Sequence, residues 1–293
     1  MSKKGLIGVQ MSTIAPNKMP KFDAYESMAR LADIGYKCIE ISQVPMSQEN
    51  VKGFRRAIDE LGFNVAAVSA LTAANPMMPG CDMSNPDEMK KMIEDAKYLD
   101  CDMFRIGAMP LQARFSLQAA VDFAQQADDF ACQLKEHGID LYYHNHHFEF
   151  VRHGGKFLMD IIKENTKYLG FELDIHWIHR GGMDPIKFIN QYAGRIRLLH
   201  LKDYRIAAME MEENADFNTK EGMMKAYAAM NDIVQFAEVG EGTLDIPGCI
   251  EAGLAGGSEY FLVEQDLSYG RDPFDCLKTS RDNLVKMGYG HWF

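Results

Sequence analysis

Short apolar runs alternate with amphipathic helical patterns along nearly the whole chain, and this alternation constrains the fold more than any other feature. The runs expected to be strands are Leu6–Met11, Cys38–Ser42, Val65–Ala70, Met103–Gly107, Ile139–His146, Leu169–Trp177, Ile196–Lys202 and Tyr260–Asp266. Helical patterns lie between them, among them Phe22–Ile34, Val51–Leu61, Asp87–Leu99, Leu117–His137 and Pro185–Tyr192. Eight strands that alternate with helices predict the α/β class and a closed (β/α)8 or TIM barrel.

Residue types at the ends of several helical patterns support these boundaries. Glycine follows three of them, at Gly35, Gly62 and Gly138. A glycine in the left-handed conformation is a common helix terminator. Asp184 and Asp272 each precede a proline, the order expected of an N-cap and the first helical turn.

One segment departs from the alternation of strands and helices. Residues 204–234 form a long connection after the seventh strand and include the acidic, Met-rich run Met209-Glu-Met-Glu-Glu-Asn. We expect residues 1–293 to form a single barrel domain with an insertion at about 204–234. A connection at this end of a barrel strand lies on the catalytic face, so the insertion is interpreted as a helical lid or a partner-binding element. The alternative is a solvated excursion with no role.

Composition narrows the classes of partner. The formal net charge is -11, which argues against nucleic acid or an anionic membrane surface as a partner, because both select basic patches. No apolar stretch approaches the roughly 18 residues that a membrane span needs. The six cysteines are scattered without a Cys-x-x-Cys pair, as is typical of reduced thiols in the cytoplasm.

Metal-binding side chains recur at the ends of the later apolar runs. His144 and His146 close one run, and Asp174, His200 and Glu264 close or end three others. Because parallel strands deliver their carboxyl ends to one rim, these groups are expected to gather there. A mixture of imidazole and carboxylate suits Mn²⁺, Co²⁺, Fe²⁺ or Zn²⁺, and Mg²⁺ is retained as a further divalent candidate.

Side-chain alternation predicts a second layer outside the first. Along a strand, residues two apart face the same side, so His146, His176, Lys202 and Asp266 are expected to follow the four candidate ligands outward, toward a substrate. The alternative for any one histidine is a hydrogen-bonded structural residue. The joint pattern favours the metal site.

Five segments carry a resemblance to a known family. They are Tyr143-His-Asn-His-His-Phe-Glu-Phe, Glu172-Leu-Asp-Ile-His-Trp, Leu199-His-Leu-Lys-Asp, Glu238-Val-Gly-Glu-Gly-Thr-Leu-Asp and Leu262-Val-Glu-Gln-Asp. As a set they resemble the xylose isomerase-like TIM barrels, which include ketose 3-epimerases, hydroxypyruvate isomerase and inosose dehydratase. The similarity is greatest to the bacterial members labelled sugar phosphate isomerase/epimerase.

The resemblance implies a ligand set and one departure from it. In the epimerase branch, a Glu, an Asp, a His and a Glu from strands five to eight bind one divalent metal. Asp174, His200 and Glu264 match the last three. On strand five, His144 stands where the relatives have Glu, and His146 is the alternative ligand. Glu149 is a third ligand candidate if the loop after strand five curls back. The resemblance implies a symmetric exchange of a proton between two glutamates, and the histidine puts this exchange in question. A His/Glu pair could still remove and return a proton, or expel a leaving group.

Further residues are assigned roles around this centre. The catalytic candidates are Glu264, His146, Glu149 and Lys202, and the substrate-binding candidates are His176, Trp177, Glu40 and Arg105. Lys202 could instead pair with a neighbouring aspartate. Trp177 could be ordinary packing, and Glu40 and Arg105 could each be half of a buried ion pair.

Three functions are compatible with these residues. The first is a divalent-metal-dependent isomerase or epimerase that removes a proton next to the carbonyl of a sugar or sugar derivative. The second is a lyase or dehydratase acting on a keto-inositol or a 3-keto-glycoside. The third is a non-catalytic barrel that binds a sugar or a partner. The expected partner is a small-molecule sugar, and a homo-oligomer is left open. Because imidazole titrates near pH ~6.5, activity is expected to fall as the pH drops through about 6–7.

Overall fold

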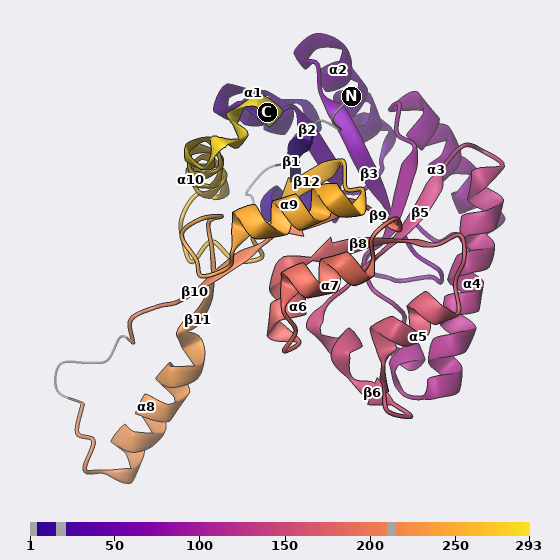
Figure 1. The fold of residues 1–293 in the computed structure, drawn as a ribbon. Coiled ribbons are helices and arrows are strands. Elements are labelled where there is room, and N and C mark those ends of the chain that lie inside the picture. Colours follow the sequence, from indigo (N-terminus) through magenta and orange to yellow (C-terminus); the bar gives the residue numbers. More distant parts are fainter. Residues whose placement is uncertain (1–4, 16–21, 210–214) are drawn as a thin grey trace.

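A closed barrel of eight parallel strands forms the centre of the part of the chain that the structure describes, residues 5–15, 22–209 and 215–293 of a computed structural model (Figure 1). Around the barrel the strand order is β1-β12-β9-β8-β5-β4-β3-β2. The bounds are β1 Leu6–Gln10, β2 Cys38–Ile41, β3 Asn64–Ala70, β4 Met103–Ile106, β5 Asp140–His144, β8 Gly170–Asp174, β9 Ile196–Leu201 and β12 Tyr260–Val263. The predicted TIM barrel is confirmed.

The helices surround this barrel, except for α8, which lies on an arm (Figure 1). They are α1 Ala24–Ile34, α2 Gln48–Leu61, α3 Pro86–Tyr98, α4 Leu117–Lys135, α5 Leu158–Glu164, α6 Ile175–Arg180, α7 Pro185–Gln191, α8 Lys220–Asp232, α9 Ile246–Gly256 and α10 Pro273–Leu284, with short helical turns η1 Met11–Ile14, η3 Leu111–Arg114, η4 His147–Phe150, η5 Val285–Tyr289 and η6 Gly290–Trp292. Among the described residues, no helix is long and apolar enough to cross a membrane.

The predicted helix ends are largely confirmed. Gly35 and Gly62 terminate α1 and α2 with φ of 116° and 73°. The carboxylates of Asp184 and Asp272 accept hydrogen bonds from backbone N–H groups in the first turns of α7 and α10. The fourth helix ends at Lys135, three residues before Gly138.

The barrel interior changes from apolar to charged along the strands. One buried apolar cluster contains Cys38, Met103, Tyr142, Leu198 and Leu262. Two residues further along the chain from these stand Glu40, Arg105, His144 and His200 on their strands and Glu264 just after β12, all of them buried. Residues two apart on a strand face the same side. The apolar cluster therefore forms a floor below a layer of charged and imidazole groups.

Several strands end earlier than the sequence predicted. The fifth ends at His144 rather than His146, β8 ends at Asp174 rather than Trp177, and β12 ends at Val263. The prediction of a strand through Trp177 is wrong, because the chain becomes helical at Ile175 and forms α6. The Asp174 carboxylate starts this helix by accepting a hydrogen bond from the backbone N–H of Trp177.

The insertion at about 204–234 forms an arm that extends from the barrel and does not lie over its catalytic face (Figure 1). Strands β10 (Asp203–Ile206) and β11 (Val234–Ala237) form an antiparallel ribbon, and α8 lies beyond it. Figure 1 shows α8 projecting away from the barrel. The expectation of a helical lid over the catalytic face is therefore wrong for α8. Residues 210–214, which belong to the acidic run, lie outside the described residues. A second small ribbon pairs β6 (Arg152–His153) with β7 (Lys156–Phe157).

Candidate metal centre and active site

Four buried side chains meet at the carboxyl ends of neighbouring strands. His144 ends β5, Asp174 ends β8, His200 lies on β9 and Glu264 follows β12. One nitrogen or oxygen atom from each of the four lies within 4.8 Å of all the others. The strand register accounts for this, because Asp174 pairs with His200 across β8 and β9. The structure thus brings together the four residues that the strand-end pattern singled out.

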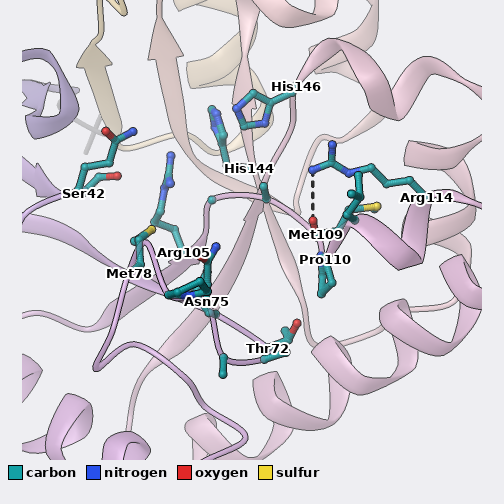
Figure 2. Close-up of a pocket in the computed structure, with 18 of the residues that line it drawn as sticks. Ser42, Thr72, Asn75, Met78, Arg105, Met109, Pro110, Arg114, His144 and His146 are labelled. Atoms are coloured by element: carbon teal, nitrogen blue, oxygen red, sulfur yellow. Dashed lines mark hydrogen bonds between the residues drawn. The ribbon is translucent and has the colours of Figure 1, made fainter.

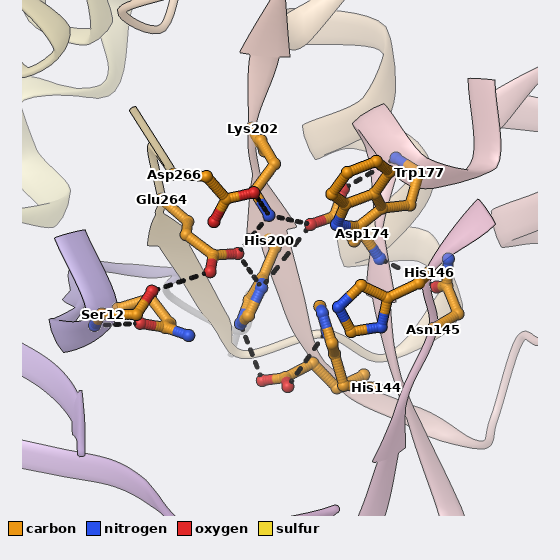
Figure 3. Close-up of polar contacts among 12 residues, drawn as sticks. Ser12, His144, Asn145, His146, Asp174, Trp177, His200, Lys202, Glu264 and Asp266 are labelled. Atoms are coloured by element: carbon orange, nitrogen blue, oxygen red, sulfur yellow. Dashed lines mark hydrogen bonds and ion pairs between the residues drawn. The ribbon is translucent and has the colours of Figure 1, made fainter. Parts of the chain in front are cut away.

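The carboxylates of this cluster are already held in place by donors (Figure 3). His200 Nδ1 lies 2.9 Å from Glu264 Oε2 and 3.8 Å from Asp174 Oδ2. Lys202 Nζ lies 2.8 Å from Glu264 Oε2 and 3.2 Å from Asp174 Oδ2, and 3.1 Å from Asp266. These contacts fix both carboxylates in one orientation, as a binding site for a small cation requires.

Two residues that the sequence reading missed complete the positioning. Ser12 Oγ donates a hydrogen bond of 2.9 Å to Glu264 Oε1. The side-chain oxygen of Asn145 accepts one of 3.0 Å from the backbone N–H of Asp174. Ser12 follows the first strand closely, so the strand-end rule that found the other residues could have found it too.

The electrostatics of the cluster favour a cation. Burial works against a charged His200, yet Glu172, Glu40 and Glu264 outweigh it and raise its pKa well above the ordinary value. Burial, followed by the charge of Arg105, lowers the pKa of His144 well below its ordinary value, so this imidazole is neutral. A position that attracts positive charge, beside a neutral imidazole with a free lone pair, suits a metal ion.

A charge count leads to the same conclusion. Within the described residues, the carboxylates of this cluster that are at most 4% exposed are Glu40, Glu172, Asp174 and Glu264, and its buried basic side chains are Arg105 and Lys202. Without an ion, the raised pKa values of His200 and Glu40 offset this charge, because both groups hold a proton at pH 7. When an ion takes the place of the His200 proton and all four carboxylates are ionised, two negative charges remain to be compensated. A divalent cation supplies two positive charges, and the mixed nitrogen and oxygen donors suit a borderline ion. The residues present therefore fit the group.

A cavity of about 550 Å³ opens beside the cluster (Figure 2). Its base includes His144, His146 and Glu264, and its walls come from the loops that follow β3 and β4. Ser42, Thr72 and Asn75 add polar groups to the walls, and Arg114 closes one side. The volume is in the range of cavities that hold small organic ligands, which run from about 300 to 1,000 Å³.

The predicted second layer is only partly as expected. His146 lies beside His144, with ring centroids 4.8 Å apart, and it lines the cavity. Its pKa is lowered to about 3 by burial first and by the charge of Lys202 second. His176 belongs to α6 instead, where its ring contacts Tyr204 and Phe236 of the arm's base. The expectation that Asp174 and His176 share one strand face is wrong for this reason.

Glu149 and Trp177 lie beside His146. The carboxylate of Glu149 accepts hydrogen bonds from the Tyr143 hydroxyl and from the backbone N–H of His146. It is fully buried and is not among the residues that line the cavity. Trp177 lies with its ring centroid 5.6 Å from that of His146, and Lys202 Nζ lies 4.9 Å from the Trp177 ring.

Glu40 and Arg105 form ion pairs below the cluster. Arg105 Nε lies 2.9 Å from Glu40 Oε1 and 2.8 Å from Glu172 Oε2. Arg105 also reaches the cavity wall, whereas Glu40 is not among the lining residues. Burial raises the pKa of Glu40 to about 8 against the opposing charge of Arg105. The buried ion pair, which was one of the two interpretations of these residues, is present.

Comparison with known proteins identifies the family. The model of the xylose isomerase-like TIM barrel family matches residues 28–268. The chain belongs to this family. Among curated proteins, the inosose dehydratase of Geobacillus kaustophilus is 35% identical over 92 residues, 30% of this chain and 29% of that protein. The inosose dehydratase of Clostridium perfringens is 29% identical over 124 residues, 42% of this chain and 38% of that protein. The chain thus matches well under half the length of these relatives.

Solved structures of other proteins share the fold over nearly the whole chain. A sugar phosphate isomerase/epimerase from Parabacteroides distasonis has a TM-score of 0.71 at 18% identity, with 98% of this chain and 99% of that chain covered. An L-ribulose 3-epimerase has a TM-score of 0.63 at 15% identity, with 98% and 95% covered. The IOLI protein with a bound zinc atom has a TM-score of 0.61 at 14% identity, with 98% and 99% covered. At these identities the likeness establishes the fold alone.

Proposed function

We propose that this protein is a divalent-metal-dependent enzyme that removes a proton from the carbon next to the carbonyl of a sugar or sugar derivative. The observation that carries the proposal is the buried cluster of two imidazoles and two carboxylates at the base of a cavity. The family relatives are enzymes of sugar and cyclitol chemistry, which supports a catalytic function.

His144, Asp174, His200 and Glu264 would hold the ion, with His146 as the alternative to His144. The donor set is compatible with Mn, Co, Zn, Fe or Mg, and the zinc atom of the IOLI protein supports a divalent ion. When bound, such an ion acts as a Lewis acid that polarises the carbonyl and so acidifies the adjacent C–H bond.

The protein's own side chains supply the proton transfer. His146 lines the cavity, and its pKa is lowered to about 3, so its ring is neutral at pH 7 and is a weak base. It is the first proton-transfer candidate because of its position. Lys202 is held against Glu264 and Asp174, and its ammonium group can stabilise negative charge that develops on a substrate oxygen. Glu264 is the second proton-transfer candidate. His176 and Trp177 remain substrate-binding candidates at the edge of the site.

The fate of the proton defines two catalytic candidates. Return of the proton to the substrate, on the other face or at the neighbouring carbon, gives an epimerase or isomerase. Loss of a hydroxyl group from the next carbon gives a dehydratase, in which the proton and the hydroxyl leave as water. The curated relatives favour the second candidate, since both are inosose dehydratases. The presence of His144 in place of a carboxylate also makes the two sides of the site chemically unequal.

A proton-exchange assay tests the proposal. The metal-loaded protein is incubated in D₂O with ketoses, keto-inositols and 3-keto-glucosides, and the loss of C–H signals is followed by NMR. We expect exchange at a carbon next to the carbonyl for one of these classes, and no exchange after treatment with a chelator. A metal-loaded protein that exchanges none of them, yet binds a sugar, would favour the non-catalytic barrel.

A further inference from the structure

A closed ring of four buried side chains lies directly beneath the candidate metal centre. It consists of Glu40 on β2, Arg105 on β4, Glu172 on β8 and His200 on β9. Their side chains are between 0% and 5% exposed. Each carboxylate uses one oxygen toward Arg105 and the other toward His200. His200 is therefore shared between this ring and the metal centre above it.

The two edges of the His200 imidazole face different partners. On the lower edge, Nε2 lies 3.1 Å from Glu40 Oε2 in a hydrogen bond and 3.1 Å from Glu172 Oε1. On the upper edge, Nδ1 lies 2.9 Å from Glu264 Oε2 in a hydrogen bond and 3.8 Å from Asp174 Oδ2. When an ion takes the place of the Nδ1 proton, an imidazole that still donates from Nε2 offers the Nδ1 lone pair to that ion.

We propose that Glu40 is a positioning residue that fixes His200 as the Nε2–H tautomer and aims Nδ1 into the metal centre. This inference rests on the proposed function, because it assigns a role in holding the same ion. A histidine ligand whose second nitrogen donates to a carboxylate is both oriented and made more basic, and loss of such a partner typically weakens metal binding 10–100-fold.

Arg105 and Glu172 hold Glu40 in the position that this role requires. Arg105 Nε donates a hydrogen bond of 2.8 Å to Glu172 and lies 2.9 Å from Glu40 Oε1. Two buried carboxylates side by side would repel each other without this guanidinium. Glu40, Glu172 and His200 also place donor atoms within 4.8 Å of one another. Since Arg105 already bridges both carboxylates, this trio acts as the support of the centre rather than as a second metal site.

The test compares Co²⁺ binding by Glu40→Leu and by a matched control. The control is Glu238→Leu, which removes another buried carboxylate that pairs with arginines, Arg271 and Arg205, away from the centre. Affinity is measured by competition with a chelator, and ligand geometry by the visible absorption of bound Co²⁺. We expect Glu40→Leu to bind Co²⁺ about 10–100-fold more weakly with an altered spectrum, and the control to match the wild type. Glu40→Gln, which keeps an acceptor oxygen, should recover part of the affinity.

A second measurement needs no variant of Glu40 and so decides the matter even if Glu40→Leu does not fold. In the Zn²⁺-loaded wild type, ¹⁵N NMR of the histidine rings should show His200 with a proton on Nε2. A His200 proton on Nδ1, or unchanged Co²⁺ affinity and spectrum in Glu40→Leu, would overturn the positioning role and leave the proposed function standing. A wild-type protein that binds neither ion would overturn both.

Discussion

Asp174 shows how one side chain can serve the fold and the site together. Its Oδ1 caps α6 by accepting the backbone N–H of Trp177, and its Oδ2 faces Lys202 and His200. One carboxylate oxygen therefore stabilises the helix and the other belongs to the candidate metal centre, and a suitable substitution can remove one role without the other.

We expect Asp174→Asn to lose metal binding and turnover while it keeps the cap, because an amide oxygen can still accept the Trp177 N–H. Asp174→Ala should lose both, with a further loss of stability of about 1 kcal/mol, as is usual for a missing N-cap. Unfolding in the presence of a chelator and metal content measure the two effects. Asp184→Asn, which alters the N-cap of α7 away from the site, is the control. Full turnover in Asp174→Asn would remove this residue from the ligand set.

The pH dependence should differ from the expectation drawn from sequence. An unperturbed imidazole would lose activity as the pH drops through about 6–7. Burial, and then Lys202, lower the pKa of His146 to about 3. A lowered pKa keeps the ring neutral over a wider acidic range, so protonation of His146 should not reduce kcat/KM between pH 7 and 5. A pH–rate profile checks this. A wild-type decline near pH 6.5 that disappears in His146→Gln would contradict it.

Among single residues, the strand-end pattern predicted which side chains gather at the rim, and their role as metal ligands stays a prediction. His144, Asp174, His200 and Glu264 were found because each stands at the end of an apolar run, which the barrel brings to one rim. The ring beneath, with Glu40 and Arg105, depends on side-chain directions inside the barrel. Those directions cannot be derived from the position of one residue on one strand.

Among the elements, the ends of the strands and the position of the arm differ most from what the sequence predicted. The apolar run through Trp177 continues in a helix, since apolar residues on a short buried helix look like those of a strand. Asp174, at the start of this helix, is the N-cap that marks it. From the sequence, only a metal-binding role was predicted for this residue. The strand–helix alternation itself was correctly predicted, because it depends on the whole pattern and not on single boundaries.

The arm can be removed without opening the antiparallel ribbon at its base. Ala207 N–H donates to the carbonyl of Ile233 at the end of the ribbon. Replacing residues 208–232 with Asn-Gly should therefore close the ribbon with a two-residue turn. Because α8 projects away from the barrel (Figure 1), metal content and turnover should be retained. Size-exclusion chromatography reports at the same time whether the arm is needed for any oligomer. Loss of the metal in this variant would show that the arm supports the site.

In the whole molecule, the barrel buries four carboxylates at one end. Four buried carboxylates of the cluster face Arg105 and Lys202, while the apolar cluster closes the barrel below. The net charge of the chain is -11, and these buried carboxylates concentrate acidic groups at one position, where a cation can bind.

Metal binding should therefore stabilise the entire fold. A ligand that binds only the native state adds about 2.7 kcal/mol at 100 times its dissociation constant. We expect Mn²⁺ or Zn²⁺ to raise the melting temperature of the wild type in a concentration-dependent way, and to leave that of Asp174→Asn unchanged. An equal rise in both proteins would place the ion elsewhere.

Anomalous diffraction from crystals of the protein loaded with Zn²⁺ or Mn²⁺ would locate the ion. We expect one strong peak per chain at the carboxyl end of the barrel, with His144, Asp174, His200 and Glu264 at bond lengths of about 2.0–2.2 Å for zinc. Density with no peak among these four residues, in crystals that hold the ion elsewhere, would contradict this expectation.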